Sequence, residues 1–335
     1  MRVGTTITQL IIEEQRRAGG TGDFTQLMHD IVTAVKVVSN AVGHGALGDV
    51  LGQAGTENVS GEAQKKLDVL ANEAIIRCNE WRGHVAAMAS EELEGIYHLP
   101  VEYPRGKYLL LFDPLDGSSN IEVNGPMGTI FSILRHNQGK EPQVEDFLRP
   151  GVEQVGAGYA LYGAATLMVI STGTGVHEFT LDKDIGEFIL SRPHIRIPED
   201  TEEFAINSSN ARFWDPPVRR YIEECLAGKD GPRGKDFNMR WAGTMVADVH
   251  RILCRGGVFL YPADSKTRAK KQEGKLRLLY EASPMAFLVE QAGGRASTGE
   301  CSLLEVRPQV LHQKIPVILG SKNEVELLES YFRQG

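Results

Sequence analysis

Segment 113–120, which reads DPLDGSSN, contains the residue types of a metal-bridged phosphate site. Asp113 and Asp116 lie three residues apart beside a proline, so both carboxylates can point to one place. Gly117 lets a ligand approach the backbone closely, and the amides of a helix beginning at 118–119 would lie beside the carboxylates. Carboxylate oxygens suit a hard divalent cation, and helix amides suit phosphoryl oxygens. A simple tight turn explains this segment equally well.

Four further acidic residues lie next to predicted strands or helices. Glu91 and Glu92 follow an apolar stretch, and adjacent carboxylates at a strand end point to opposite faces. One of them could therefore bind a metal while the other serves a second metal or acts as a base. Glu281 follows the predicted strand 276–280, at a strand-to-helix junction where α/β proteins bind ligands. Asp68 gives a similarly weak signal, and for each acid alone a structural or surface role is the more common explanation.

The composition is that of an ordinary globular protein with an acidic surface. The 335 residues are enough for about two domains of roughly 150 residues each. Acidic residues outnumber basic ones by 44 to 36, a net charge of −8, which disfavours nucleic acid as a partner. The segment 266–271 holds four basic residues but no aromatic ones, so a solvated loop is favoured over an anion-binding patch.

The cysteines and the longest uncharged stretch bear on the cellular location. Cys78, Cys225, Cys254 and Cys301 lie singly, without the CxxC spacing or histidine pair of a zinc site, so reduced thiols are expected. No secretion signal is recognised, which favours a cytoplasmic protein without a membrane partner. The stretch 155–176 has membrane-spanning length, but its glycines and β-branched residues favour two buried strands with a turn.

Helices and strands are predicted in both halves of the chain, which favours a layered α/β or α+β fold. Predicted helices cover 24–42, 217–226, 245–255 and 285–292; others begin near 66 and after a capping box at 321–324. Predicted strands cover 84–90, 107–112, 128–135, two segments within 155–170, 258–261 and 276–280.

Three details of this scheme depend on glycine, proline and capping residues. The strand 107–112 is expected to end at Asp113, which precedes a proline. The segment 43–61 holds six glycines and is predicted to be a loop without helix or sheet. The helix 285–292 is expected to have Ser283 as its N-cap and Gly293 as its stop. The irregular segment 190–200 is the best candidate for a linker.

Taken together, five motifs resemble those of class I fructose-1,6-bisphosphatases, and the resemblance extends over about residues 5 to 333. The motifs are SEE at 90–92, FDPLDGSSN at 112–120, VADVHR at 246–251, GKLRLLYE at 274–281 and PMAF at 284–287. The resemblance implies the layered αβαβα sugar phosphatase fold with two mixed sheets, in the inositol monophosphatase-like superfamily. It also implies an N-terminal allosteric domain, 1–195, that carries most metal ligands, a C-terminal substrate-binding domain, 196–335, and a homotetramer.

The same resemblance assigns the acidic residues to catalysis of phosphate ester hydrolysis. Two or three Mg²⁺ ions, with Mn²⁺ or Zn²⁺ as alternatives, would be held by Glu91, Glu92, Asp113, Asp116, Glu281 and the carbonyl of Leu115. Asp68 and Glu92 would be the catalytic residues, with Asp68 helping to deprotonate the attacking water. Such ions lower the pKa of water and spread the charge of an in-line displacement at phosphorus.

The resemblance also implies contacts to a sugar bisphosphate. The 1-phosphate would be held by Asp116, Gly117, Ser118 and Ser119; the sugar and 6-phosphate by Asn207, Trp241, Met245, Tyr261 and Lys275; and Arg240 would reach the 6-phosphate of a neighbouring subunit. Trp241 and Asn210 stand where the family often has tyrosines, and an indole N–H donates but cannot accept.

A second implied site would bind AMP as an inhibitor at the start of the helix 24–42. Its residues would be Thr21, Gly22, Asp23 and Thr25, together with Lys107, Tyr108 and Arg135. Asp23 replaces the more usual glutamate, and plain helix capping is the alternative explanation of this turn. The glycine-rich segment 43–61 corresponds to the family's loop that closes over the active site, with an ordinary surface loop as the alternative.

Other functions remain open at this stage. A bisphosphatase of wider range would also accept sedoheptulose 1,7-bisphosphate. A relative acting on inositol phosphates fits less well, because Lys275, Tyr261 and Arg240 suit a second phosphate. A non-catalytic sugar-phosphate sensor would gain nothing from crowding like charges. Thiol control is not expected, because the cysteine-bearing insertion of the plastid enzymes is missing between 135 and 158.

Overall fold

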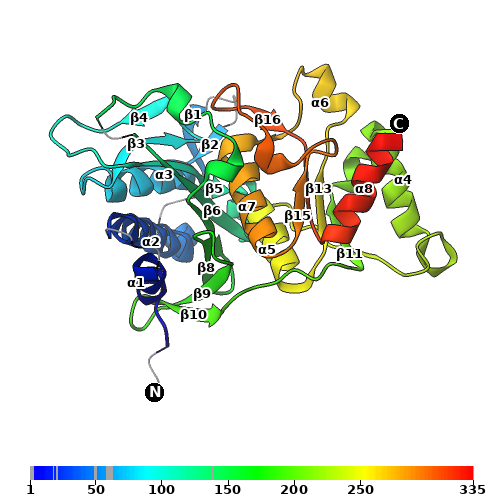
Figure 1. Cartoon of the computed structure of the whole chain (residues 1–335), viewed down its shortest axis with the longest axis horizontal. Coiled ribbons are helices and arrows are strands. Elements are labelled where there is room, and N and C mark those ends of the chain that lie inside the picture. Colours follow the sequence, from blue (N-terminus) through cyan, green and yellow to red (C-terminus); the bar gives the residue numbers. More distant parts are fainter. Residues whose placement is uncertain are drawn as a thin grey trace.

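The computed structural model describes residues 4–17, 19, 22–48, 51–57, 63–137 and 139–334. These residues form five layers, helix, sheet, helix, sheet and helix (Figure 1). The helices are α1 (Ile7–Arg17), α2 (Asp23–His44), α3 (Lys66–Asn79), α4 (Pro216–Leu226), α5 (Met245–Arg255), α6 (Ser265–Ala269), α7 (Ser283–Gln291) and α8 (Lys322–Gln334). The layered α/β prediction with two mixed sheets is therefore confirmed.

The larger sheet has eight strands in the order β10-β9-β8-β7-β6-β5-β3-β4. Its strands are β3 (Val85–Ser90), β4 (Ile96–His98), β5 (Tyr108–Asp116), β6 (Met127–Arg135), β7 (Gly156–Tyr162), β8 (Thr166–Ser171), β9 (His177–Asp182) and β10 (Glu187–Arg192). Only β3 and β5 are parallel neighbours, so the sheet is mixed.

The smaller sheet has five strands in the order β12-β11-β13-β17-β15 and is also mixed. Its strands are β11 (Glu203–Ile206), β12 (Asn238–Met239), β13 (Val258–Tyr261), β15 (Arg295–Ser297) and β17 (Val317–Gly320). Two short pairs complete the strands, β1 (Gln53–Glu57) with β2 (Ala63–Lys65), and β14 (Leu276–Arg277) with β16 (Lys314–Ile315). The irregular segment 193–202 connects the two sheets.

Four apolar clusters hold the layers together, and three of them lie under the helices, since each sheet has two apolar faces to cover. Helices α1, α2 and α3 cover one face of the larger sheet with residues such as Leu27 and Val35. Helices α5 and α7 lie between the sheets, where Val249 and Leu288 pack against both of them. Helices α4 and α8 cover the far face of the smaller sheet (Figure 1). These layers bring the ends of β3 and β5 close to the smaller sheet.

The stretch 155–176 shows why an uncharged run need not cross a membrane. It forms the two antiparallel strands β7 and β8, buried in the middle of the larger sheet, as predicted. Strands buried on both faces are apolar along their whole length. Within the described part of the chain, no helix has both the length and the apolar character needed to span a bilayer.

Several predicted boundaries were wrong. Strand β5 does not end at Asp113 but continues to Asp116, with a bulge opposite β6, because a residue before proline favours the extended conformation. The segment 43–61 contains a 3₁₀ helix, Gly45–Gly48, and β1, while 49–50 and 58–61 lie outside the described residues.

The predicted strand 276–280 and its neighbouring helix start also needed correction. Only Leu276–Arg277 is extended, and Leu278–Ala282 forms a π-helix that runs directly into α7. Ser283 is therefore the first residue of α7 rather than its N-cap. The predicted stop is confirmed, since Gly293 follows the helix with a φ of 86°.

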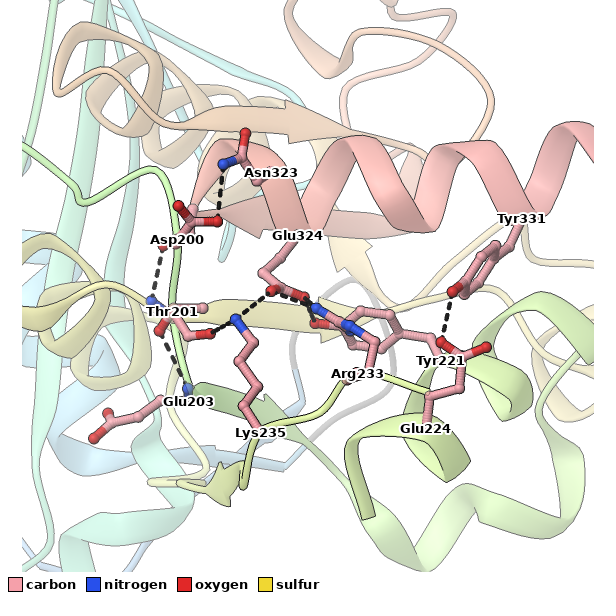
Figure 2. A network of polar contacts seen from close by, with 12 residues as sticks. Asp200, Thr201, Glu203, Tyr221, Glu224, Arg233, Lys235, Asn323, Glu324 and Tyr331 are labelled. Atoms are coloured by element: carbon pink, nitrogen blue, oxygen red, sulfur yellow. Dashed lines mark hydrogen bonds and ion pairs between the residues drawn. The ribbon is translucent and has the colours of Figure 1, made fainter. Parts of the chain in front are cut away.

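The start of α8 differs from the predicted capping box. Glu324 is 2% exposed, and its carboxylate accepts hydrogen bonds from Arg233 at 2.6 and 2.7 Å and from Tyr221 at 2.8 Å. Lys235 Nζ lies 3.5 Å from the same carboxylate. Figure 2 shows both cations reaching α8 from the loop that follows α4. The carboxylate thus joins α8 to this loop instead of capping its own helix.

We expect Glu324→Ala to lower the free energy of unfolding by about 3 kcal/mol, because the guanidinium of Arg233, only 13% exposed, loses its carboxylate partner. Urea unfolding followed by circular dichroism measures this change. Lys322→Ala, on the same helix turn but exposed, should change stability by less than about 0.5 kcal/mol. Equal effects of the two substitutions would contradict this account of the network.

Candidate active site

A cavity of about 390 Å³ lies where the ends of β3, β5 and α5 meet the smaller sheet. The structure brings to its wall nearly all residues predicted to bind metal or a sugar bisphosphate: Asp68, Glu91, Glu92, Asp113, Leu115, Asp116, Gly117, Ser118, Ser119, Asn207, Trp241, Met245, Tyr261, Lys275 and Glu281. Arg240 does not line it. The roles of these residues stay predictions, but their convergence from distant segments is an observed feature.

Three carboxylates form the centre of the cavity. Asp113, Asp116 and Glu281 each place an oxygen within 4.8 Å of the other two. The bulge at the end of β5 directs both aspartates to this point, and the π-helix brings Glu281. Asp113 Oδ1 accepts the amide hydrogen of Leu115 at 2.9 Å, and Asp116 Oδ2 accepts that of Val246 at 2.7 Å. The second bond attaches Asp116 to the first turn of α5, where a helix favours negative charge.

Burial and like charge raise the pKa values of these acids. Asp113 has a pKa well above its usual value, because it is buried and faces the charges of Glu91 and Glu281. Burial, followed by the charge of Glu281, raises the pKa of Asp116 to about 7. Burial raises the pKa of Glu91 to about 9, although Arg277 opposes this shift. Carboxylates crowded in this way fit hard divalent cations, which favour their charged forms.

Arg277 is a member of this cluster that the sequence reasoning did not single out. It is 7% exposed, and its guanidinium forms ion pairs with Glu91 and, at 3.8 Å, with Glu281. Its backbone amide also donates to Glu281 at 2.6 Å. A single arginine within the apolar run 276–280 was the feature of the sequence that could have indicated this role. Its side chain positions two carboxylates and offsets part of their charge.

Asp68 and Glu92 lie on another wall of the cavity. Asp68, in the first turn of α3, accepts the amide hydrogen of Lys65 at 2.8 Å. Burial, and to a lesser extent the charge of Glu92, raises the pKa of Asp68 to about 7. Gln64, also missed from the sequence, donates its side-chain amide to Glu92. A carboxyl group with a pKa near 7 can exchange protons at neutral pH.

The 3₁₀ helix Ser118–Val123 supplies amide groups beside the carboxylates, as the sequence suggested. Its first internal hydrogen bond runs from the amide of Asn120 to the carbonyl of Gly117, so the amides of 118 and 119 precede it. Gly117 has a φ of 82°, and a Cβ atom there would lie 2.1 Å from Thr244. The backbone conformation and the packing at this position therefore both require glycine. The sequence had suggested only that Gly117 lets a ligand approach the backbone.

Aromatic residues form the opposite end of the cavity. The rings of Trp241 and Phe259 stack at 5.9 Å, and Tyr261 packs against both. Lys275 places its ammonium group 5.4 Å from the centre of the Tyr261 ring. Asn207 begins the 3₁₀ helix Ser208–Phe213 by accepting the amide hydrogen of Ser209. This end offers one cation and several polar donors over an apolar floor.

The predicted AMP residues that the structure describes lie around the start of α2. Gly22 precedes the helix with a φ of 94°, and Asp23 pairs with Lys107 at 2.5 Å. Lys107 and Arg135 place their cationic groups 6.0 and 5.9 Å from the centre of the Tyr108 ring. Thr25 is buried on α2. Thr21 lies outside the described residues.

Comparisons with known proteins cover nearly the whole chain. The family model of the N-terminal domain of fructose-1-6-bisphosphatase matches residues 5–193, and that of the C-terminal domain matches residues 197–333. The chain is similar to the crystal structure of fructose-1,6-bisphosphatase from Leishmania major in its holo form. The two are 41% identical, with a TM-score of 0.91 over 99% of each chain.

The raised pKa of Asp116 predicts how pH affects the protein in the presence of a chelator. A carboxyl group with a raised pKa keeps a proton that the unfolded chain releases, so its contribution to stability falls between about pH 4 and pH 7. Asp116→Asn removes this loss, and it should stabilise the chelated protein more at pH 8 than at pH 5 by urea unfolding. The exposed control Asp184→Asn should show no such pH dependence. A variant less stable than wild type at pH 8 would contradict the prediction.

Proposed function

Because the chain belongs to the fructose-1,6-bisphosphatase family and is a phosphoric monoester hydrolase, we propose that it hydrolyses fructose 1,6-bisphosphate at its 1-phosphate. The products are fructose 6-phosphate and phosphate, and the proposed cofactor is Mg²⁺. The observation that carries the proposal is the meeting of Asp113, Asp116 and Glu281 in a cavity whose other end holds Lys275.

Glu91, Glu92, Asp113, Asp116, Glu281 and the carbonyl of Leu115 are the proposed ligands of two or three ions. When bound, Mg²⁺ supplies positive charge that polarises the phosphoryl group and the attacking water. The chain's own residues orient the substrate and handle protons. Carboxylate and carbonyl oxygens are the donors that this cation prefers, so the residues present fit it.

The remaining groups near the carboxylates act on the phosphate and the water. The amides of Ser118 and Ser119 face the phosphoryl oxygens at the start of their 3₁₀ helix. Asp68, with Glu92 beside it, accepts the proton that the attacking water releases, and a pKa of about 7 suits Asp68 for this exchange. Gln64 keeps the Glu92 carboxylate on the same wall. The first turn of α3 positions Asp68, and the 3₁₀ helix Ser118–Val123 positions the two amides.

The aromatic end of the cavity is the proposed site of the sugar and the 6-phosphate. Lys275 supplies the positive charge there, while Asn207 and Tyr261 supply hydrogen bonds. Met245, at the start of α5, packs against the sugar. Trp241 takes the place of a tyrosine, so it can donate one hydrogen bond but cannot accept one. Arg240 is proposed to act on the neighbouring subunit of a homotetramer.

We further propose that AMP inhibits the enzyme at the start of α2. The positions of Lys107 and Arg135 beside Tyr108 support this, since two cations next to an aromatic ring suit a nucleoside phosphate. Residues 1–195 are then the allosteric domain and 196–335 the substrate domain. A cytoplasmic location is part of the same proposal.

We expect Asp116→Asn and Glu92→Gln to stay folded and to lose at least about 100-fold in kcat, because loss of a metal ligand costs no less than loss of a residue that orients a ligand. Phosphate release from fructose 1,6-bisphosphate measures this. Glu94→Gln, an exposed acid two residues from Glu92, is the matched control and should keep wild-type activity. A chelator should abolish the wild-type activity and Mg²⁺ should restore it; full turnover in either variant would refute the assignment.

The AMP site predicts that Lys107→Ala needs at least about ten times more AMP for half inhibition, because a cation that contacts phosphate is lost. Activity without AMP should stay within about twofold of wild type. The exposed Lys183→Ala should be inhibited like wild type. Indifference of the wild type to AMP, or equal inhibition of both variants, would contradict the proposed site.

A further inference from the structure

A second group of potential metal ligands lies away from the active-site cavity. Glu178 on β9 and His250 and Cys254 on α5 each place a ligand atom within 4.8 Å of the other two. His250 and Cys254 are four residues apart and therefore share one face of the helix. Cys254 lies nine positions after Met245 of the cavity wall, about 14 Å along the helix axis. The group is thus distinct from the cluster of Asp113, Asp116 and Glu281.

Two of the distances between these atoms can be compared with those of a tetrahedral zinc site. Zinc bonds of about 2.3 Å to sulfur and about 2.1 Å to nitrogen or oxygen separate S and N by about 3.6 Å, and N and O by about 3.4 Å. Cys254 Sγ lies 3.6 Å from His250 Nε2. Glu178 Oε2 lies 3.9 Å from the same nitrogen. A shift of about 0.5 Å in this carboxylate would bring Oε2 to the zinc-site distance from His250 Nε2, and Oε2 already lies within 4.8 Å of Cys254 Sγ.

Glu178 provides an independent sign that a ligand is needed. The residue is 4% exposed, and its Oε2 atom has no hydrogen-bond partner among the described residues. Its other oxygen, Oε1, accepts the hydroxyl of Ser191 at 2.9 Å, which fixes the carboxylate in place. A buried carboxylate oxygen without a partner is costly. A cation bound to Oε2 removes that cost.

His250 is oriented to use Nε2 as a ligand. Its Nδ1 atom lies 2.8 Å from the hydroxyl of Tyr159, so the second ring nitrogen is engaged outside the group, as in most metal-bound histidines. Burial lowers the pKa of His250, which favours the neutral imidazole. Only the neutral ring has a lone pair to offer a metal.

Arg192 is the cation that faces this group. Its guanidinium donates to Cys254 Sγ and lies 3.8 Å from Glu178 Oε1. An N–H donor to sulfur is compatible with a metal-bound thiolate. The Arg192 side chain is half exposed, so it can also move toward solvent and leave a fourth position open to water.

From this geometry we propose that Glu178, His250 and Cys254 form a second, structural metal site that takes a thiophilic divalent cation such as Zn²⁺. The ion joins α5 to β9 and so ties the middle helical layer to the larger sheet. A zinc site at the cysteines was not expected from the sequence, because neither CxxC spacing nor a histidine pair is present. Here the third ligand, Glu178, lies on a strand more than seventy residues before His250.

Cobalt is a suitable probe, because a thiolate bound to Co²⁺ gives a near-ultraviolet charge-transfer band that an all-oxygen site cannot give. We expect this band at one equivalent of Co²⁺ in the full-length wild type with excess Mg²⁺ present, and its loss when Zn²⁺ is added. Asp116→Asn should keep the band, which separates this site from the proposed phosphatase site. Cys254→Ser should abolish the band, and the exposed Cys301→Ser should keep it.

Two further variants test the geometry. Glu178→Gln should weaken Co²⁺ binding by at least about tenfold, and Tyr159→Phe by about tenfold through loss of the partner on His250 Nδ1. Zn²⁺ should raise the melting temperature of wild type but not that of Cys254→Ser, with circular dichroism confirming that the variant is folded. Absence of the band in wild type, or its persistence in Cys254→Ser, overturns the proposal.

Discussion

Crowding of carboxylates in one buried cavity is the constraint on which the rest of the structure depends. Burial and mutual repulsion raise the pKa values of Asp113, Asp116 and Glu91, so these groups resist carrying their charges together. Arg277 offsets only part of that charge, because it is one cation facing several acids. Divalent cations would offset the remainder, and the proposed phosphate ester hydrolysis uses the same cations. The crowded carboxylates thus account both for the free-energy cost of assembling the site and for its proposed chemistry.

The layered fold supplies the rigidity that such a site needs. Two sheets, with α5 and α7 packed between them, bring the end of β5 and the π-helix before α7 to the same point. The first turn of α5 binds Asp116 through the amide of Val246, while the last turns of the same helix carry the proposed zinc ligands. The first turn of α5 thus contacts the end of β5, and its last turns lie beside Glu178 on β9. Both ends of this helix therefore contact the larger sheet. Buried carboxylates stay close together only where the elements carrying them cannot move apart.

Local patterns predicted the regular elements and missed those that tertiary contacts decide. Apolar periodicity was enough for α2 and α5, because each buries one stripe of its surface. It failed at 276–280, where Arg277 pairs with the distant Glu91 and Leu276 pairs with the distant Ile315. Individual acids such as Asp68 were ambiguous in the sequence, and only the topology brings them together. The resemblance to a family supplied their roles, whereas Arg277 and Gln64 became visible only through their contacts.

The most direct test of the central claim is an anomalous difference map from a crystal grown with Mn²⁺ and phosphate. The account predicts manganese peaks bonded to Asp113, Asp116 and Glu281, with at least one peak shared with Glu91 or Glu92 and a phosphate oxygen in contact with the ions. A map with no manganese in this cavity, or with the ions bound only to surface acids elsewhere, would contradict it.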